Sequence, residues 1–154
     1  MEIINGDINV NLAKKASQYN NINKLVYISA AHYTIPNFLQ QGYYNGKFKT
    51  ENAIQQYFKS NNYSILRPSF IYGIRHTTNT ALPLQYIGRP LEILLRTSPA
   101  TFMRQTTIGY YLNSILTPPI NVKDVANAAV DAATGNNIHG ILEVDDIYKL
   151  THST

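Results

Sequence analysis

Residues Lys24–Ser29 read KLVYIS, a largely apolar run of strand length that contains β-branched residues. A run without regular polar alternation is typical of a strand covered on both faces, as in a parallel sheet. A second run, YSILRPSFIYG at Tyr63–Gly73, is expected to end as a regular strand near Pro68, because proline has no N–H for the ladder. The fold is therefore expected to be built around two buried strands.

The segment between these strands predicts the helix that connects them. GYYNGKFKTENAI, Gly42–Ile54, opens a helix that is expected to run to about Ser60. Parallel strands joined by a helix form a right-handed βαβ unit, and ligands of such sheets bind beyond the carboxyl ends of the strands. We expect an α/β fold with a parallel sheet flanked by helices.

Further helices are expected on either side of this unit. Residues 9–21 predict a short amphipathic helix with Asn9 as its cap. A helix within residues 81–97 should be interrupted or started near Pro90, with apolar contacts from Leu91, Leu94 and Leu95. Residues 121–134 give the strongest helical pattern, with an apolar stripe made by Val122, Val125, Ala129, Val130 and Ala133. GILEV and DDIYKL then predict a short strand and a terminal helical turn.

Composition limits the classes of function. The 154 residues suggest one domain spanning 1–154, and the net charge of +4 comes from scattered basic residues, so we expect no nucleic-acid partner. The chain has no Cys, and its four His show no ligand spacing, so no metal site is expected. No window approaches the roughly 18 consecutive apolar residues of a membrane span, and the first residues resemble no targeting segment.

Tyr43 and Lys47 are a candidate proton-transfer pair. Residues four apart share a helix face, and an ammonium near a phenol favours the phenolate, which lowers the tyrosine pKa toward values useful for proton transfer. Ser29 follows the preceding strand, where its hydroxyl could bind a substrate carbonyl. Because the chain holds 12 Tyr, the spacing carries weight only through this placement.

Several segments, in order, resemble the short-chain dehydrogenase/reductase family. NKLVYISA resembles the serine strand of its extended and atypical members, GYYNGKFKTENAI their Tyr-x-x-x-Lys helix with Glu51 four residues after the lysine, and LRPSFIYG their Arg-Pro-Gly-x-x-Tyr-Gly strand. LPLQYIGRPLEILLR and LTPPINVKDVANAAVDAAT resemble the atypical organellar branch, which includes proteins of quinone biosynthesis and plastid lipid droplets and is related to an accessory subunit of respiratory complex I.

The resemblance implies a role for each matched position. Lys47 would hydrogen-bond the nicotinamide ribose of NAD(P), and Tyr43 would be the acid/base beside Ser29. The nicotinamide side would be lined by four consecutive residues, Pro68, Ser69, Phe70 and Ile71. Ser69 stands where the family has glycine, and its side chain would crowd a close backbone approach to the ligand. The tyrosine at position 44 leaves open whether Tyr43 is catalytic.

One part of the family pattern is missing from the sequence. The eight glycines form no glycine-rich turn that could meet a pyrophosphate, so the chain resembles only the C-terminal portion of the family fold. The resemblance therefore implies a partial Rossmann-type parallel sheet flanked by helices, without the N-terminal glycine-rich βαβ unit. The buried strands should then leave an exposed apolar edge and be marginally stable alone. The chain could be a sequence that lost its first part, which we rank highest, a split protein whose partner chain supplies the missing strands, or a degenerate relative.

These observations leave alternative functions open. The resemblance implies an NAD(P)-dependent oxidoreductase linked to quinone metabolism such as ubiquinone biosynthesis, although this fragment by itself should be inactive. The alternative is a non-catalytic accessory or assembly protein of an organellar quinone or respiratory complex, and a third reading is an interaction fragment that uses its open sheet edge. The resemblance implies a mitochondrial or plastid location.

Overall fold

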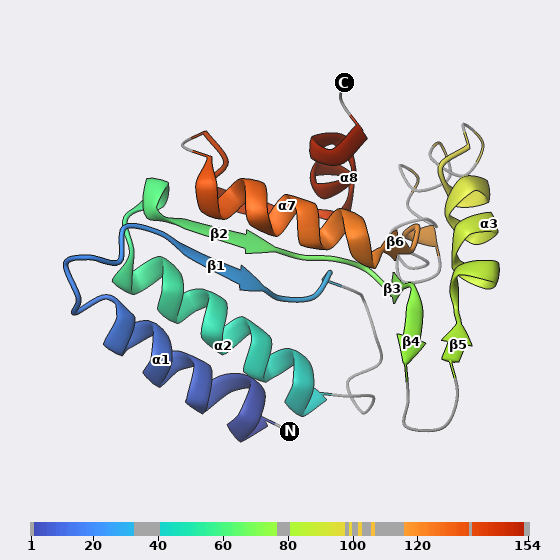
Figure 1. The fold of residues 1–154 in the computed structure, drawn as a ribbon. Helices are drawn as coiled ribbons and strands as arrows, with labels where there is room; N and C mark the ends of the chain where they lie inside the picture. The colour runs from blue at the N-terminus through green and yellow to red at the C-terminus, as the bar shows by residue number, and fades with distance from the viewer. Residues whose placement is uncertain are drawn as a thin grey trace. The chain divides into compact units, whose positions relative to one another are not determined.

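The computed structural model describes residues 2–32, 41–76, 81–97, 116–135 and 137–152, together with residues 99, 102 and 106. Helices alternate with short strands, so the fold is mixed α/β (Figure 1). The helices are α1 (Ile8–Ala16), which continues from a π-helical turn at Ile3–Asp7, α2 (Gln41–Tyr57), a 3-10 turn at Ser60–Asn62, α3 (Gln85–Leu95), α7 (Val122–Thr134) and α8 (Val144–His152). The strands are β1 (Leu25–Ile28), β2 (Tyr63–Leu66), β3 (Ile71–Tyr72), β4 (Ile74–His76), β5 (Ala81–Pro83), β6 (Ile120–Asn121) and β7 (Gly140–Leu142).

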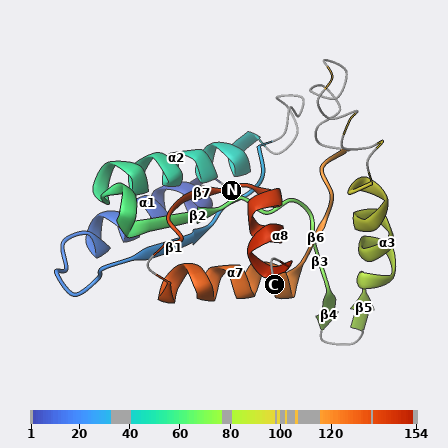
Figure 2. The same cartoon turned by 90° about the horizontal axis from the view of Figure 1, so that it is seen from above.

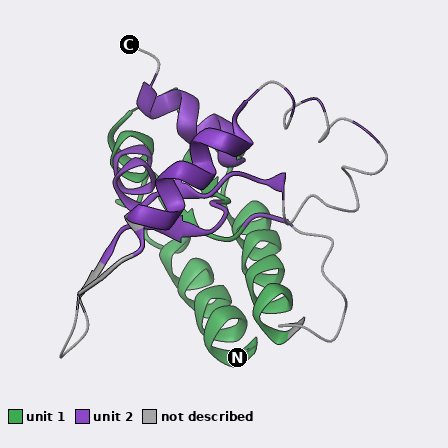
Figure 3. Cartoon of the chain, turned by 90° about the vertical axis from the view of Figure 1, so that its right-hand side faces the viewer, with its two compact units in different colours: residues 1–30, 36–67, 129–142 green, residues 31–35, 68–128, 143–154 purple. Residues whose placement is uncertain are grey.

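The chain divides into two compact units (Figure 3). The first unit comprises residues 1–30, 36–67 and 129–142, and the second comprises residues 31–35, 68–128 and 143–154. The single domain expected from the chain length stays a prediction. None of the helices in the described ranges is both long and apolar enough to cross a membrane.

The first unit contains a parallel sheet in the order β1-β2-β7 (Figure 2). Leu25 pairs with Tyr63, and Ser64 pairs with Gly140. The α2 helix lies between β1 and β2 in the sequence, so the expected β-α-β order with parallel strands is confirmed. Among the described residues β1 has a partner on one side only, and Ile28 at its end is 43% exposed. The expected open edge is therefore present in this part of the chain.

The helices α1 and α2 pack side by side in the first unit (Figures 1 and 2). Their contact is close because two glycines meet: a Cβ at Gly46 would lie 3.0 Å from the backbone nitrogen of Gly6. The Thr50 hydroxyl donates to the carbonyl of Gly46 or that of Asn5, each 3.0 Å away. Gly46, inside the Tyr43–Lys47 segment, thus has a packing role. The core of the unit contains Ala13, Ile54, Phe58 and Ile65.

Asn9 is not the cap of the first helix, so that prediction is wrong. Asp7 before it already has helical backbone angles, and the helix continues through Ile3–Asp7. Asn9 therefore does not stand before the first turn of the helix, where its side-chain oxygen could accept from unpaired backbone N–H groups. Its side-chain amide instead lies 3.2 Å from the carbonyl oxygens of both Ile4 and Asn5.

In its described residues the second unit contains two small sheets, the parallel pair β3–β6 and the antiparallel pair β4–β5, together with α3 and α8. The α3 helix runs through Pro90, so it is neither started nor interrupted there as expected. Glycine at position 88 lets α3 lie against Tyr72, because a Cβ there would be 2.5 Å from the Tyr72 Cβ. Leu95 is buried as predicted, whereas Leu91 and Leu94 are 42% and 61% exposed because Glu92 takes the inward position.

The helix predicted at residues 121–134 is confirmed as α7, but its buried face differs from the predicted stripe. Val125 is buried, whereas Val122 and Val130 are 46% and 60% exposed. Ala128 and Ala132 take the inward positions. The prediction placed Val122 and Val130 on the buried face, whereas the packing selected the small residues Ala128 and Ala132, which allow a helix to approach its neighbours closely. The predicted strand and terminal helix are found as β7 and α8.

Candidate functional site

Lys47 lies on α2 and reaches the carboxyl end of β1. Its ammonium donates a hydrogen bond to the carbonyl oxygen of Ile28, with Nζ 2.9 Å away. The same Nζ lies 4.9 Å from the centre of the Tyr27 ring and 5.7 Å from that of Tyr43. Burial lowers the pKa of Lys47, and the carboxylate of Glu51 opposes this shift. Lys47 is thus a partly desolvated cation held at the end of a parallel strand.

Ser29 immediately follows β1, and its backbone N–H donates to the carbonyl of Leu66 at 2.7 Å. The residue is only 5% exposed, and its hydroxyl Oγ has no hydrogen-bond partner among the described residues. A buried hydroxyl without a partner costs about 1–3 kcal/mol, so such groups commonly mark sites where a ligand or water binds. Ser29 and the Lys47 acceptor Ile28 are consecutive, which brings two of the predicted residues to one strand end.

Of the two adjacent tyrosines, Tyr43 and Tyr44, it is Tyr43 whose ring lies near the Lys47 ammonium. The rings of Tyr43 and Tyr44 meet edge to face, with centres 5.3 Å apart and planes 86° apart. Burial raises the pKa of Tyr44, and Tyr43 adds to the shift. Ser29, Tyr43 and Lys47 all belong to the first unit, and the Lys47 ammonium lies 2.9 Å from the carbonyl oxygen of Ile28, next to Ser29 in the sequence, and 5.7 Å from the centre of the Tyr43 ring.

Tyr27 is a neighbour of Lys47 that the sequence reasoning missed. Burial raises the pKa of its hydroxyl, the Thr50 hydroxyl lowers it, and the charge of Glu51 raises it again. A usable signal was present, because residues two apart on a strand point to the same face, and Tyr27 precedes Ser29 by two. Its ring is closer to the Lys47 ammonium than that of Tyr43.

Glu51 joins the α2 helix to the end of β2 through Arg67. The carboxylate accepts from Arg67 Nε at 3.2 Å and from Nη2 at 2.5 Å. Glu51 is 2% exposed, and the Arg67 side chain is 13% exposed. Since Glu51 is one helical turn beyond Lys47, this ion pair fixes the rotation of α2 and so the position of the Lys47 ammonium.

The residues predicted to line the nicotinamide belong to the second unit, unlike Ser29, Tyr43 and Lys47. Pro68 and Ser69 are buried, and the Ser69 hydroxyl donates to the carbonyl of Pro118 at 2.5 Å. Phe70 is 59% exposed, and Ile71 begins β3. The serine that replaces the family glycine is therefore used in an internal hydrogen bond.

Comparisons with known proteins give one relative without an assigned activity. An uncharacterized chloroplastic protein of Arabidopsis thaliana is 32% identical over 148 residues, which cover 96% of this chain and 49% of the relative. The chain thus spans about half the length of this curated relative. No protein-family model and no solved structure matches the chain.

Proposed function

We propose that this chain is the C-terminal half of an NAD(P)-binding protein of the short-chain dehydrogenase/reductase type, with a partial Rossmann-type sheet. The observation that carries the proposal is the Lys47 ammonium on the carbonyl of Ile28, the residue before Ser29, whose buried hydroxyl has no hydrogen-bond partner in the described part of the chain. Both groups stand at the carboxyl end of a parallel strand, where open α/β sheets bind their ligands.

Each residue has a role in this proposal. Lys47 would hydrogen-bond the ribose hydroxyls, for which it would exchange its bond to Ile28. The Ser29 hydroxyl would orient a substrate carbonyl, and Tyr43 would transfer the proton. The cofactor, when bound, supplies the hydride. Its pyrophosphate would be held by polypeptide outside this chain, which agrees with a relative about twice as long.

The Arabidopsis relative also suggests where in the cell to look for this protein. Its name places the Arabidopsis protein in the chloroplast. Of the two organelles implied by the family resemblance, we propose the plastid for this protein rather than the mitochondrion. A plastid quinone is then the substrate class we would test first.

The cofactor role is tested by titrating NADPH into the intact protein and following nucleotide fluorescence. Lys47→Ala should weaken binding by about tenfold, because a charge-assisted hydrogen bond is lost. Lys49→Ala is the matched control, since Lys49 lies on the same helix but pairs with the exposed Asp7. Equal affinity of the Lys47→Ala variant and the unaltered protein would remove Lys47 from the cofactor site.

One observation favours a non-catalytic accessory function as the second candidate. The Lys47 ammonium is bound to a backbone carbonyl and lies nearer to Tyr27 than to Tyr43. The two functions are separated by NADPH-dependent quinone reduction in the variants Tyr43→Phe and Tyr44→Phe. Catalysis by Tyr43 predicts loss of activity only in Tyr43→Phe, whereas cofactor binding without any reduction in the unaltered protein supports the accessory function.

A further inference from the structure

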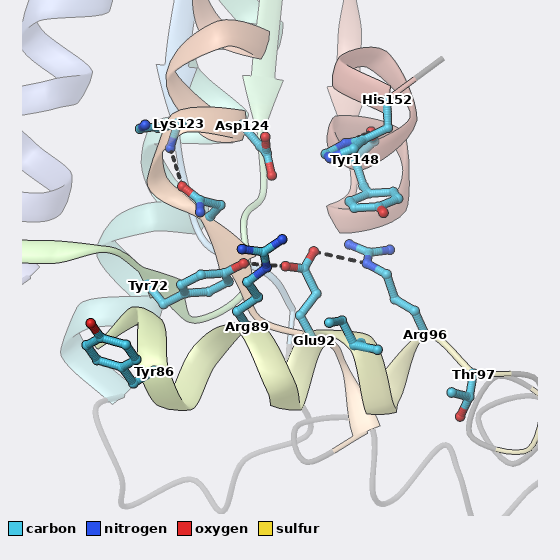
Figure 4. A pocket seen from close by; sticks show the side chains of 12 residues that line it. Tyr72, Tyr86, Arg89, Glu92, Arg96, Thr97, Lys123, Asp124, Tyr148 and His152 are labelled. Atoms are coloured by element: carbon cyan, nitrogen blue, oxygen red, sulfur yellow. Dashed lines mark hydrogen bonds and ion pairs between the residues drawn. The ribbon is translucent and has the colours of Figure 1, made fainter. Parts of the chain in front are cut away.

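The second unit contains a cavity of about 650 Å³ lined by side chains of α3, the start of α7 and α8 (Figure 4). This volume is in the range of sites that hold small organic ligands. All of its lining residues belong to the second unit, so the cavity shares no residue with Ser29, Tyr43 or Lys47.

One wall of the cavity is fixed by a buried network centred on Glu92. The Tyr72 hydroxyl donates to Glu92 Oε2 at 2.6 Å, and Arg96 Nε donates to Oε1 at 3.1 Å. Tyr72 is 3% exposed and Glu92 7%. Both carboxylate oxygens of Glu92 are therefore engaged, and its charge is compensated within the wall.

The Arg96 guanidinium is also held by an aromatic stack. It lies 3.5 Å from the centre of the Tyr148 ring, and His152 stacks on Tyr148 with ring centres 4.1 Å apart. Figure 4 shows Tyr148 between the two. Arg96 Nη1 donates to Asp145 at 3.1 Å, but Nη2 is buried without a hydrogen-bond partner among the described residues. Arg96 is thus held by the Tyr148 ring and two hydrogen bonds, and Nη2 is its one nitrogen without a partner in the described part of the chain.

Two more cations line the cavity without an ion-pair partner in the described part of the chain, Arg89 on α3 and Lys123 on α7. With Arg96, the lining holds three cationic side chains and two carboxylates, Glu92 and Asp124. Arg96 is already paired with Glu92, so the lining charges outside that pair are those of Arg89, Lys123 and Asp124, and their net positive charge favours an anion.

The lining also offers apolar surface. Tyr86 and Ile93, both on α3, are 74% and 62% exposed and line the cavity. An aromatic ring and an aliphatic side chain beside cationic groups suit a ligand with an apolar part and an anionic end.

We propose that this cavity binds a small organic anion whose carboxylate or phosphate oxygens accept from Arg89, Arg96 and Lys123. The apolar part of the ligand lies against Tyr86 and Ile93. Asp124, as the carboxylate not engaged by the Glu92 network, opposes binding and limits the affinity. The site is independent of the proposed NAD(P) function, because none of its residues takes part in it.

The binding test uses benzoate, phenyl phosphate and inorganic phosphate as probes, each followed by amide chemical shifts of the ¹⁵N-labelled full chain. Saturable shifts at Glu92, Asp124 and Tyr148 with either aromatic anion support the site and identify its preferred anionic group. Benzyl alcohol is the neutral control. Equal shifts with benzyl alcohol, or no saturable shifts in the cavity with any anion, would overturn the proposal.

Variants test which side chains carry the affinity. Arg89→Gln and Lys123→Gln, both at exposed positions that should leave folding intact, are expected to weaken binding about threefold to tenfold, and Arg96→Gln about tenfold or more. Asp124→Asn should tighten binding severalfold, which a merely structural role would not predict. Lys149→Gln, on α8 but outside the cavity, should change nothing. Unaltered affinity in both Arg89→Gln and Lys123→Gln would refute the assignment.

Discussion

Each unit contains a buried helical glutamate bound to an arginine, but the two arginines are used differently. In the first unit, Arg67 directs Nε and Nη2 at one carboxylate, that of Glu51. In the second unit, Arg96 divides its donors between Glu92 and the half-exposed Asp145, and its Nη2 has no partner among the described residues. The first pair fixes a helix on a strand, whereas the second forms the wall of a cavity.

The difference assigns the two arginines different roles: Arg67 positions one element on another, whereas Arg96 can bind a ligand. A forked arginine engaged by one buried carboxylate gives a strong and specific contact between elements. An arginine with spare donors beside a cavity retains capacity for a ligand. The comparison predicts that stability depends more on the first pair and ligand affinity more on the second.

The largest effect is expected for Glu51→Gln. The change removes a buried negative charge from Arg67, and breaking a buried ion pair costs about 3–5 kcal/mol in the free energy of unfolding. Urea unfolding followed by circular dichroism measures it. Glu92→Gln should cost less, because Arg96 keeps Asp145, and a larger loss from Glu92→Gln than from Glu51→Gln would break the comparison.

An intermediate effect is expected for Tyr72→Phe. The phenylalanine leaves one Glu92 oxygen buried without its donor, at a cost of about 1–3 kcal/mol in unfolding free energy. Tyr86→Phe, at a 74% exposed position, is the matched control. Similar stability of the two variants would show that the Tyr72 hydroxyl contributes little.

The comparison of the unaltered protein with Tyr72→Phe also predicts that the stability difference depends on pH. Burial, followed by the hydrogen bond to Glu92, raises the pKa of Tyr72 from 10.0 to about 12. Between these values the unfolded chain loses this proton while the folded chain keeps it, so the contribution of Tyr72 is complete below pH 10 and declines as the pH rises toward 12. The stability difference between the unaltered protein and Tyr72→Phe should therefore narrow over that range.

The smallest effect is expected for Asp145→Asn. Asp145 is half exposed, and exposed ion pairs contribute about 0–1 kcal/mol, which salt screens further. Unfolding in low and high salt should show a small difference that disappears at high ionic strength. A loss as large as that of Glu51→Gln would place Asp145 within the essential wall of the cavity.

The sequence alone was sufficient for the elements with strong local patterns. The apolar run of β1, the run of β2 that ends before Pro68, and the helical periodicity of α2 and α7 predicted those elements, because strand and helix formation depend on side chains a few residues apart. The Tyr43–Lys47 spacing likewise placed both side chains on one helix face. The local rule failed at Asn9, where a preceding helical turn removed the need for a cap.

The tertiary structure decided which distant groups meet. The hydrogen bond of Lys47 to Ile28, the pairing of Glu51 with Arg67 and the contact of Arg96 with Tyr148 join residues from different elements. Sequence patterns report periodicity and burial, but not the register and rotation at which packed elements bring side chains together. The candidate residues at the end of β1 could therefore be named from the sequence, whereas their partners and the cavity of the second unit required the folded chain.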